Sequence, residues 1–353
     1  MLRQLARLGH AVPGLGPRAL ALGVYARHDD ELVPAREAGV EGIACVDDAA
    51  RALELYCDLW AATALPWTHR WCLGLLDFVL AMQDGDGRWI NFILDWDGAA
   101  NRTGRTSLPG GGFWQARALQ ALVHAIPILD DSRIAPAVER GLPHAFADHV
   151  PPDVRVLHMM TACALLRQGA DAAPLLASLL TWSEELVDCK VDGVLMNSPF
   201  EVGTPHLWGH VQEGVLADVG ALLGRDELIA TALTSADKLY PAIVGSNFDV
   251  PLTQPYGVAC AAYSLTRIAA ISGDAHYGTL AAKALRWFDG ENPARKPVYD
   301  RVAGRVGDGI DHGVVNASSG AESNIVAAQA LFGDATELAR SLTTSAALPE
   351  AIH

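Results

Sequence analysis

The chain has 353 residues, of which 50% are hydrophobic, so it can bury a large core. Acidic residues outnumber basic ones by 41 to 26, which gives a formal net charge of −15. Nucleic acid is bound through clustered lysines and arginines that neutralise phosphates, so this balance excludes nucleic acid as the expected partner. No apolar run approaches the roughly 18 residues that a membrane-spanning helix needs, so we expect no membrane partner either.

The N-terminal residues 1–45 are expected to form a lead-in segment that packs on the main domain. A short amphipathic helix is predicted over residues 2–8, and an extended apolar stretch follows over residues 19–25. Arginines at positions 3, 7 and 18 interrupt the apolar residues, so the uninterrupted core of a secretory signal is missing. We therefore expect a cytoplasmic protein.

The six cysteines predict no metal centre. They are scattered without CxxC spacing, and five of them lie inside predicted helices or at helix ends. A free thiol in such a position acts as a small apolar side chain. We expect neither a bound metal nor a cofactor.

From residue 46 onward, a repeated pattern fills the chain. Six times, a loop rich in Gly, Pro or acidic residues leads into an Ala- and Leu-rich segment with helical periodicity, and a second helix of similar length follows. The first helices of these pairs are predicted over residues 46–59, 112–126, 152–167, 206–223, 256–271 and 320–332. Their partners are predicted over residues 69–83, 131–149, 172–187, 225–244, 276–289 and 334–344.

Twelve helices in six hairpins predict an all-α fold, an (α/α)6 toroid in which the first helix of each pair lines a central funnel. No Ser/Gly-rich linker and no run of charges interrupts the series, so residues 46–353 are expected to form one domain. Loops that lead into the inner helices would gather at one rim, where long loops on a rigid scaffold usually carry binding groups. If the ring closes, the sixth inner helix neighbours the first.

The loop between the first two hairpins is one of the two longest in the chain. Residues 88–97 alternate polar and apolar side chains and include Trp, Phe and Ile, which predicts a short strand or β-hairpin at the rim. On a strand, Asp95 and Asp97 would lie on one side and Trp96 on the other. Both acids are candidate catalytic residues, and solvated loop acids are the alternative explanation.

The first and sixth inner helices both begin with acidic residues. Asp47 and Asp48 open the first helix, where they can cap it, complement its dipole and pair with Arg51. Glu322 lies in the first turn of the sixth helix, after a Gly- and Ser-rich approach that is longer than a cap requires. Ring closure would bring these three acids together at the funnel mouth. Cleavage of a glycosidic bond requires two carboxyl groups, so this is the candidate catalytic pair.

The second long loop and the fourth inner helix contain further polar candidates. Asp311 is a catalytic alternative, and its neighbours Asp308, His312 and Asn316 are candidates for substrate binding. His206 and His210 are predicted four residues apart on one face of a helix, with Glu201 before them. That spacing could bind a metal, but the HExxH pattern is absent, so we expect structural histidines or contacts to sugar hydroxyls.

Aromatic residues also concentrate in the rim loops and in the first turns of the inner helices. The apolar faces of sugar rings stack on aromatic planes, and Trp adds a polar N–H. Arg117, one helical turn after Trp114, is expected to hold the same ligand, as is Arg51. The aromatic candidates are Trp89, Trp96, Trp114, Trp208 and Tyr256.

Three stretches of the chain resemble a known family: residues 46–53, residues 91–119, and residues 308–323. The sequence is similar to six-hairpin (α/α)6-toroid domains of bacterial carbohydrate metabolism, which occur alone or fused to GT-B-type glycosyltransferases. The resemblance covers most of the chain from residue 46 and implies a role in glycan metabolism. Such domains carry an acid in a Ser-Glu-Asp-like run before the second inner helix, where this chain has Thr106, Ser107 and Leu108. That carboxylate is therefore missing or is replaced by Asp95 or Asp97.

These features predict a glycoside hydrolase that acts on a short oligosaccharide or glycoconjugate. Asp48 and Glu322 form the expected catalytic pair, with Asp47 and the loop acids above as alternatives. A sugar epimerase or isomerase is the first alternative function, with His206, His210 or His158 as the base. A non-catalytic glycan-binding domain is the second alternative. Self-association as a homodimer is left open.

Overall fold

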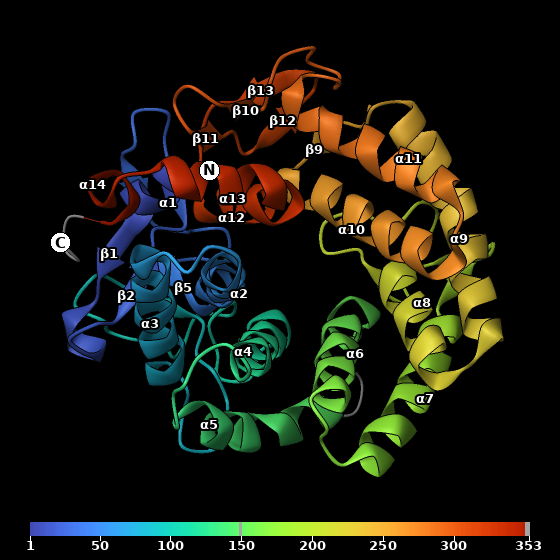
Figure 1. Cartoon of the computed structure of the whole chain (residues 1–353), viewed down its shortest axis with the longest axis horizontal. Coiled ribbons are helices and arrows are strands. Elements are labelled where there is room, and N and C mark those ends of the chain that lie inside the picture. Colours follow the sequence, from blue (N-terminus) through green and yellow to red (C-terminus); the bar gives the residue numbers. More distant parts are fainter. Residues whose placement is uncertain (148–149, 350–353) are drawn as a thin grey trace. The chain divides into compact units, whose positions relative to one another are not determined.

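The computed structural model describes residues 1–147 and 150–349, and Figure 1 labels the helices and strands. The chain divides into two compact units. Within the described residues, unit 1 comprises residues 1–147, 299–308 and 317–349. Unit 2 comprises residues 150–298 and 309–316. Two parts of the predictions lie outside the described residues. They are the end of the helix predicted over residues 131–149 and the last four residues of the predicted domain. The expectation of one domain stays a prediction.

Unit 1 contains three of the six predicted helix pairs. The helices expected to be inner ones are α2 (Val46–Thr63), α4 (Gly112–Ala125) and α12 (Ala321–Ala330). Their partners are α3 (Pro66–Ala81), α5 (Ile134–Gly141) and α13 (Phe332–Ser341). The remaining helical segments of this unit are α1 (Leu2–Leu8), α14 (Thr344–Ala347) and the 3-10 segments η1 (Pro13–Leu15) and η2 (Leu142–Phe146).

Helix α5 is shorter than predicted. It ends at Gly141, and residues 142–146 continue as the 3-10 segment η2. Pro143 lacks the N–H that an α-helix would use and its ring clashes with the carbonyl four residues earlier, so the α-helical ladder stops there.

Helix α2 packs against both α4 and α12 within unit 1 (Figure 1). The buried face of α2 is rich in alanine, including Ala49, Ala50 and Ala52, which are all inaccessible to solvent. Small side chains allow neighbouring helices to approach closely. The prediction that the sixth helix of the series lies beside the first is confirmed.

The strands of unit 1 are short antiparallel pairs. They are β1 (Gly9–Ala11) with β2 (Leu20–Leu22), β3 (Tyr25–Ala26) with β4 (Leu32–Val33), β5 (Ala44–Cys45) with β6 (Phe92–Ile93), and β10 (Tyr299–Asp300) with β11 (Arg305–Val306). A bridge between Ile93 and Ala100 also turns the first long loop back on itself, so the small β-hairpin expected there is present. A buried apolar cluster of Val24, Ala35, Cys45 and Phe92 anchors the backbone immediately before α2.

Unit 2 contains the other three helix pairs. They are α6 (Pro152–Arg167) with α7 (Ala172–Asp188), α8 (Gln212–Leu223) with α9 (Asp226–Gly245), and α10 (Pro255–Ser272) with α11 (Ala275–Leu285) and the 3-10 segment η3 (Arg286–Asp289). Helix α8 packs against α6 and α10. The strands are the pair β7 (Lys190–Val191) with β8 (Val194–Leu195), and a three-stranded sheet in the order β13 (Val314–Asn316), β12 (Gly309–Asp311), β9 (Leu252–Thr253). No helix in the described part of the chain is long and apolar enough to cross a membrane.

Candidate functional site

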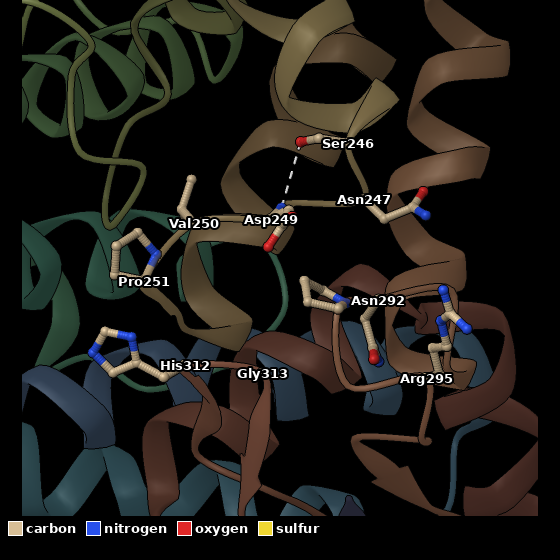
Figure 2. Close-up of a pocket in the computed structure, with 10 residues that line it drawn as sticks. Ser246, Asn247, Asp249, Val250, Pro251, Asn292, Arg295, His312 and Gly313 are labelled. Atoms are coloured by element: carbon tan, nitrogen blue, oxygen red, sulfur yellow. Dashed lines mark hydrogen bonds between the residues drawn. The ribbon is translucent and has the colours of Figure 1, made fainter.

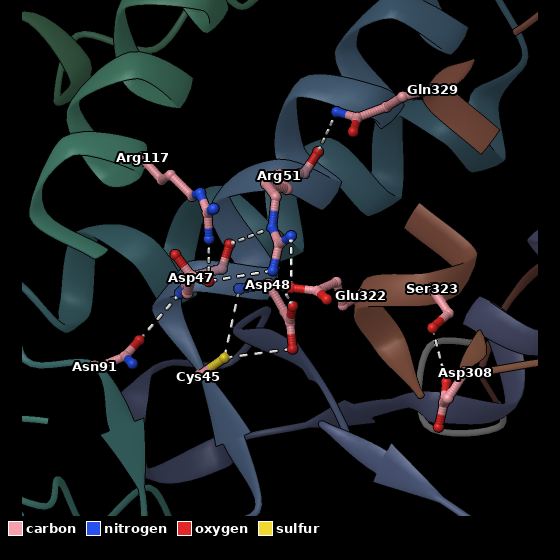
Figure 3. A network of polar contacts seen from close by, with 10 residues as sticks. All are labelled: Cys45, Asp47, Asp48, Arg51, Asn91, Arg117, Asp308, Glu322, Ser323 and Gln329. Carbon is pink, nitrogen blue, oxygen red and sulfur yellow. Dashed lines mark hydrogen bonds and ion pairs between the residues drawn. The ribbon is translucent and has the colours of Figure 1, made fainter. Parts of the chain in front are cut away.

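The guanidinium of Arg51 is the centre of a buried charge cluster in unit 1 (Figure 3). Its Nη2 donates to a carboxylate oxygen of Asp47 at 3.1 Å and to Oδ1 of Asp48 at 2.8 Å, and its Nη1 donates to Oε2 of Glu322 at 3.0 Å. Figure 3 shows the three carboxylates pointing toward this guanidinium from the starts of α2 and α12. The structure therefore brings together the acids that the sequence expected at neighbouring helix ends.

A second buried guanidinium, that of Arg117 on α4, pairs with Asp47. The backbone N–H of Asp47 donates to Oδ1 of Asn91 at 3.1 Å. Burial alone would raise the pKa of Asp47, but the charges of Arg117 and Arg51 outweigh it and leave this pKa below its usual value. Asp47 is thus held as a carboxylate, and Arg117 is engaged with it.

Asp48 is held differently. Its side chain is 4% exposed, and burial outweighs the attraction of Arg51, so its pKa rises to about 6. If all three acids are ionised, three carboxylates face two guanidiniums. Protonation of Asp48, whose pKa is raised by its burial, leaves two carboxylates opposite two guanidiniums.

Cys45 completes the surroundings of Asp48. Its Sγ accepts from the backbone N–H of Asp48 at 3.4 Å, as the N-cap of α2, and the thiol donates to Oδ2 of Asp48 at 3.4 Å. Burial raises the pKa of this thiol well above its usual value, so it stays a neutral donor. The sequence analysis treated this cysteine only as an apolar filler. Its position one residue before a predicted helix was the signal of a capping role.

We expect the stability of the protein to depend on the ionisation of Asp48. The pKa of Asp48 is about 6 in the folded state against 3.8 for the unperturbed group, so the folded state binds the proton more tightly. The stabilisation from Asp48 is therefore complete below about pH 4 and is lost as the pH rises through 6, an effect of about 3 kcal/mol. Urea denaturation from pH 4 to pH 7 should show that Asp48→Asn gains stability relative to wild type over this window. An unchanged difference between the two proteins would contradict the raised pKa, and Asp130→Asn, at an exposed position, is the control.

Glu322 is the most accessible acid of the cluster, with 27% of its side chain exposed. The start of its helix is held by Asp308, whose Oδ1 accepts from the N–H of Gly320 and from the hydroxyl of Ser323, both at 2.8 Å. Burial raises the pKa of Asp308, and the nearby charge of Glu322 adds to this effect. Asp308, expected to bind substrate, thus has a capping role in the structure.

Helix α2 carries two more acids that the sequence analysis missed. Burial raises the pKa of Glu54 to about 7, and Oδ1 of Asp58 lies 2.8 Å from Nε2 of His124 on α4. Burial alone would lower the pKa of His124, but the Asp58 hydrogen bond and the charge of Glu54 outweigh it and raise this pKa. The spacing of Glu54 and Asp58 from Asp47 follows the helical period and places all three acids on one face of the helix. This spacing was the sequence signal that could have identified them.

The expected placement of the first-loop acids is wrong. Asp95, Trp96 and Asp97 lie beyond β6 in a turn, so they do not alternate across a strand. The two carboxylates are exposed and accept from backbone N–H groups of that turn, and Trp96 stacks on His10 at 4.3 Å between ring centres. Neither acid is a member of the Arg51 cluster. The strand stops at residue 93 because these side chains satisfy the turn backbone instead.

The aromatic candidates of unit 1 differ in their exposure to solvent. Trp89, expected at the rim, is fully buried and donates through Nε1 to the carbonyl of Val79, so that expectation is wrong. Trp114 is partly exposed in the first turn of α4, and its Nε1 donates to the carbonyls of Trp89 and Leu108 at 3.0 and 3.1 Å. Trp114 therefore offers a fixed ring rather than a free N–H.

The histidine pattern of unit 2 is also not as expected. Helix α8 begins at Gln212, because Pro205 and Gly209, which has a φ of 72°, interrupt the backbone before it. His206 and His210 therefore lie in a loop and not on one helical face. Within the described residues, no group of three or more His, Cys, Asp or Glu side chains could hold a metal ion.

His210 is a buried structural residue. Its Nδ1 lies 2.8 Å from Oδ1 of Asn197, and its Nε2 lies 3.1 Å from the carboxylate of Glu213. That carboxylate also accepts from Ser235 at 2.7 Å and Tyr240 at 2.8 Å. Burial would raise the pKa of Glu213, but His210 and these hydroxyls outweigh it and lower this pKa. The network leaves His210 without exposed surface.

The other unit 2 candidates are dispersed. Glu201 shapes the loop by accepting from the N–H groups of Asn197 and His206, both at 2.9 Å. Trp208 packs edge-to-face on Tyr256 with ring centres 5.3 Å apart. The exposed candidates are Asp311, His312 and Asn316, on β12, its turn and β13, and the exposed His206 of the loop.

Comparison with known proteins bears on the fold class of the chain. No protein-family model and no curated protein sequence matches the chain. Among solved structures, it is similar to a D-mannose isomerase with a TM-score of 0.68, 9% identity and coverage of 96% of each chain. A cellobiose 2-epimerase from Bacillus thermoamylovorans gives a TM-score of 0.68 at 9% identity, covering 95% of this chain and 96% of that one. A GH76 α-mannanase of Bacteroides thetaiotaomicron gives 0.55 at 11% identity, covering 85% and 88%.

At such low identities, the similarities show the fold and leave the activity open. They extend over nearly the whole chain, and the matched proteins belong to the (α/α)6-toroid class. The expected fold class is therefore confirmed: this chain has an (α/α)6-toroid fold with small β-hairpins in its loops.

Proposed function

We propose that this protein is a glycoside hydrolase that acts on a short oligosaccharide or glycoconjugate. The observation that carries the proposal is the meeting of Asp48 and Glu322 on one guanidinium, that of Arg51. Glycoside hydrolysis needs one carboxyl group that holds a proton and one that is ionised. Pairs of acids whose surroundings separate their protonation suit this division of roles.

The different burial of the two acids supports a division of roles between them. Asp48 is nearly inaccessible and has a pKa raised to about 6, so it can hold a proton in mildly acidic solution. Glu322 is partly exposed, and its Oε2 accepts a charge-assisted hydrogen bond from Arg51. In the proposed reaction, Asp48 supplies the proton to the leaving oxygen, and Glu322 acts as the nucleophile or as the base for water.

The partly exposed ring of Trp114 supports a sugar ligand in the same unit. It lies in the first turn of α4, the helix that also carries Arg117 of the charge cluster. A sugar ring could stack on this surface while its hydroxyls bond to the carboxylates.

A panel of aryl glycosides and short natural oligosaccharides tests the proposed function. We expect the wild-type protein to release the aglycone or a reducing sugar from at least one substrate, and Glu322→Gln to release it about 10²–10⁴-fold more slowly. Binding of a sugar by both proteins without turnover of any substrate would instead support a glycan-binding domain.

A sugar epimerase or isomerase is the second candidate. The observation in its favour is the structural similarity to a D-mannose isomerase and two cellobiose 2-epimerases over 91–96% of this chain. That chemistry needs a base that reaches a C–H group beside a carbonyl, and histidine is suited to it near neutral pH. Two of the expected histidines are buried: His210 is bonded to Glu213, and burial together with Arg155 lowers the pKa of His158 to about 3. His206 is the exposed one.

Histidine variants separate the two candidates. His206→Gln is expected to leave hydrolysis within about threefold of wild type, because no proton of the proposed reaction passes through it. His210→Gln is expected to lower the free energy of unfolding by about 1–3 kcal/mol, since it removes the imidazole from the buried Glu213 and leaves only the hydroxyls of Ser235 and Tyr240. Initial rates measure hydrolysis by His206→Gln, and urea denaturation measures the stability of His210→Gln. Deuterium incorporation into D-mannose and cellobiose in D2O measures epimerase or isomerase activity. Deuterium exchange in wild type that His206→Gln abolishes would favour the epimerase.

A further inference from the structure

A polar pocket lies within unit 2 and contains no member of the Arg51 cluster (Figure 2). Its volume is about 610 Å³, which is in the range of small-molecule sites. Three segments line it: residues 246–251 after α9, residues 292–295 after η3, and the turn at residues 312–313 between β12 and β13. The pocket is therefore built from loops that α9, η3 and a β-hairpin hold in place.

The backbone around this pocket is unusual. Of the seven non-glycine residues with positive φ in the described part of the chain, four lie in these segments: Asn247 at 57°, Phe248 at 59°, Arg295 at 50° and His312 at 44°. A side chain with a Cβ is disfavoured in this left-handed region, and such residues cluster at ligand sites. Three of these four residues, Asn247, Arg295 and His312, line the pocket.

The turn between β12 and β13 also has an unusual residue for its backbone conformation. A two-residue turn with positive φ at both positions favours Asn-Gly or Asp-Gly, whereas this chain has His312-Gly313. The His312 side chain is 81% exposed and borders the pocket. Figure 2 shows His312 at the edge of the group of lining residues, on the side of Pro251.

Asn292 supplies a second, independent indication of a ligand. It is 4% exposed, and its Nδ2 donates to the carbonyls of Trp287 and Lys296, both at 2.8 Å. Its Oδ1 is buried and accepts no hydrogen bond from any described residue. A buried acceptor in this state is destabilising unless a ligand or water donates to it.

We propose that this pocket is a second carbohydrate site, which binds a neutral mono- or disaccharide. Arg295 can only donate, the carboxylate of Asp249 and Oδ1 of Asn292 can only accept, and Asn247 and His312 can do both. Asp249 and Arg295 carry opposite charges, so the lining has no net charge that would favour an anion or a cation. Sugar hydroxyls donate and accept, so a sugar satisfies the whole set. The site does not depend on the proposed reaction, because binding requires no turnover.

The test uses amide-detected NMR titration of Glu322→Gln, in which the proposed reaction cannot consume the probe. D-glucose, D-mannose and cellobiose are titrated separately, with inorganic phosphate as the competing probe. We expect saturable shifts of the amides of Asn247 and Gly313 with at least one sugar. Saturable shifts with phosphate alone, or with none of the four probes, would overturn the proposal.

A double variant, Arg295→Asn with His312→Asn, removes both pocket side chains but keeps a residue that tolerates the left-handed backbone. We expect it to weaken the sugar affinity at this pocket at least fivefold. Arg225→Ala, at an exposed arginine of the same unit that pairs with Glu227, is the matched control and should bind as wild type. Equal affinity in the double variant and the control would overturn the proposal. Failure to find a hydrolysed substrate leaves this outcome unaffected, so the two proposals fail separately.

Discussion

Glu322→Gln is expected to lower kcat on the best glycoside substrate by about 10²–10⁴-fold, the usual contribution of one acid–base group. The substitution keeps the size of the side chain and its hydrogen bond from Arg51, and removes only the negative charge. The side chain is 27% exposed, so the cost in stability should stay within about 1 kcal/mol. Initial rates and urea denaturation, measured on the same preparation, separate the catalytic effect from a folding effect.

The control for this variant is Glu337→Gln on α13, an exposed glutamate of the same unit. It should behave as wild type in both measurements. Full activity of Glu322→Gln would remove Glu322 from the reaction and with it the proposed carboxylate pair. A loss of activity that follows a loss of folded protein would instead assign Glu322 a structural role.

Arg51→Met is expected to have the largest effect on stability. Arg51 is 6% exposed and neutralises Asp47, Asp48 and Glu322 together. Its removal takes the counter-charge from the buried Asp48 and leaves Asp47 with Arg117 alone, and breaking such a buried pair typically costs about 3–5 kcal/mol. Urea denaturation at pH 7 should show this loss, and the deficit should shrink toward pH 5 as Asp48 takes up a proton.

Two further variants test the reason for this effect. Arg51→Lys keeps the charge but not the fork of donors that reaches several carboxylates at once, so it should be intermediate. Combining Arg51→Met with Asp48→Asn removes one uncompensated charge and should recover part of the lost stability. Strictly additive losses in this double variant would contradict the shared cluster, and Arg70→Met at an exposed position of α3 is the control.

The helix pairs were predictable because their signals are local. Helix α6 spans the residues predicted for it, since Pro152 can begin a helix and an apolar periodicity follows. The start of α8 was misplaced because apolar residues continue upstream of Gln212, while the left-handed backbone of Gly209 ends the regular structure there. Periodicity shows where a helix is favoured, but a turn residue decides where it begins.

The candidate site was predictable only in part. Asp48 and Glu322 were recognisable by their positions at helix starts, and the neighbouring helices bring them together. Trp89, Asp95 and His210 have the same residue types as expected site residues, but one is core, one is a turn acid and one is a buried network member. Residue type does not distinguish these cases, because exposure depends on packing by distant segments.

By itself, the sequence determined the series of helical hairpins, because propensity, apolar period and turn residues act over a few positions. Only the tertiary structure decided which charges share a site. Arg51 and Glu322 are 271 positions apart in the chain, and their ion pair forms because α12 packs on α2. The raised pKa of Asp48 was also a tertiary outcome, since burial and the opposing charge of Arg51 act through space and not along the sequence.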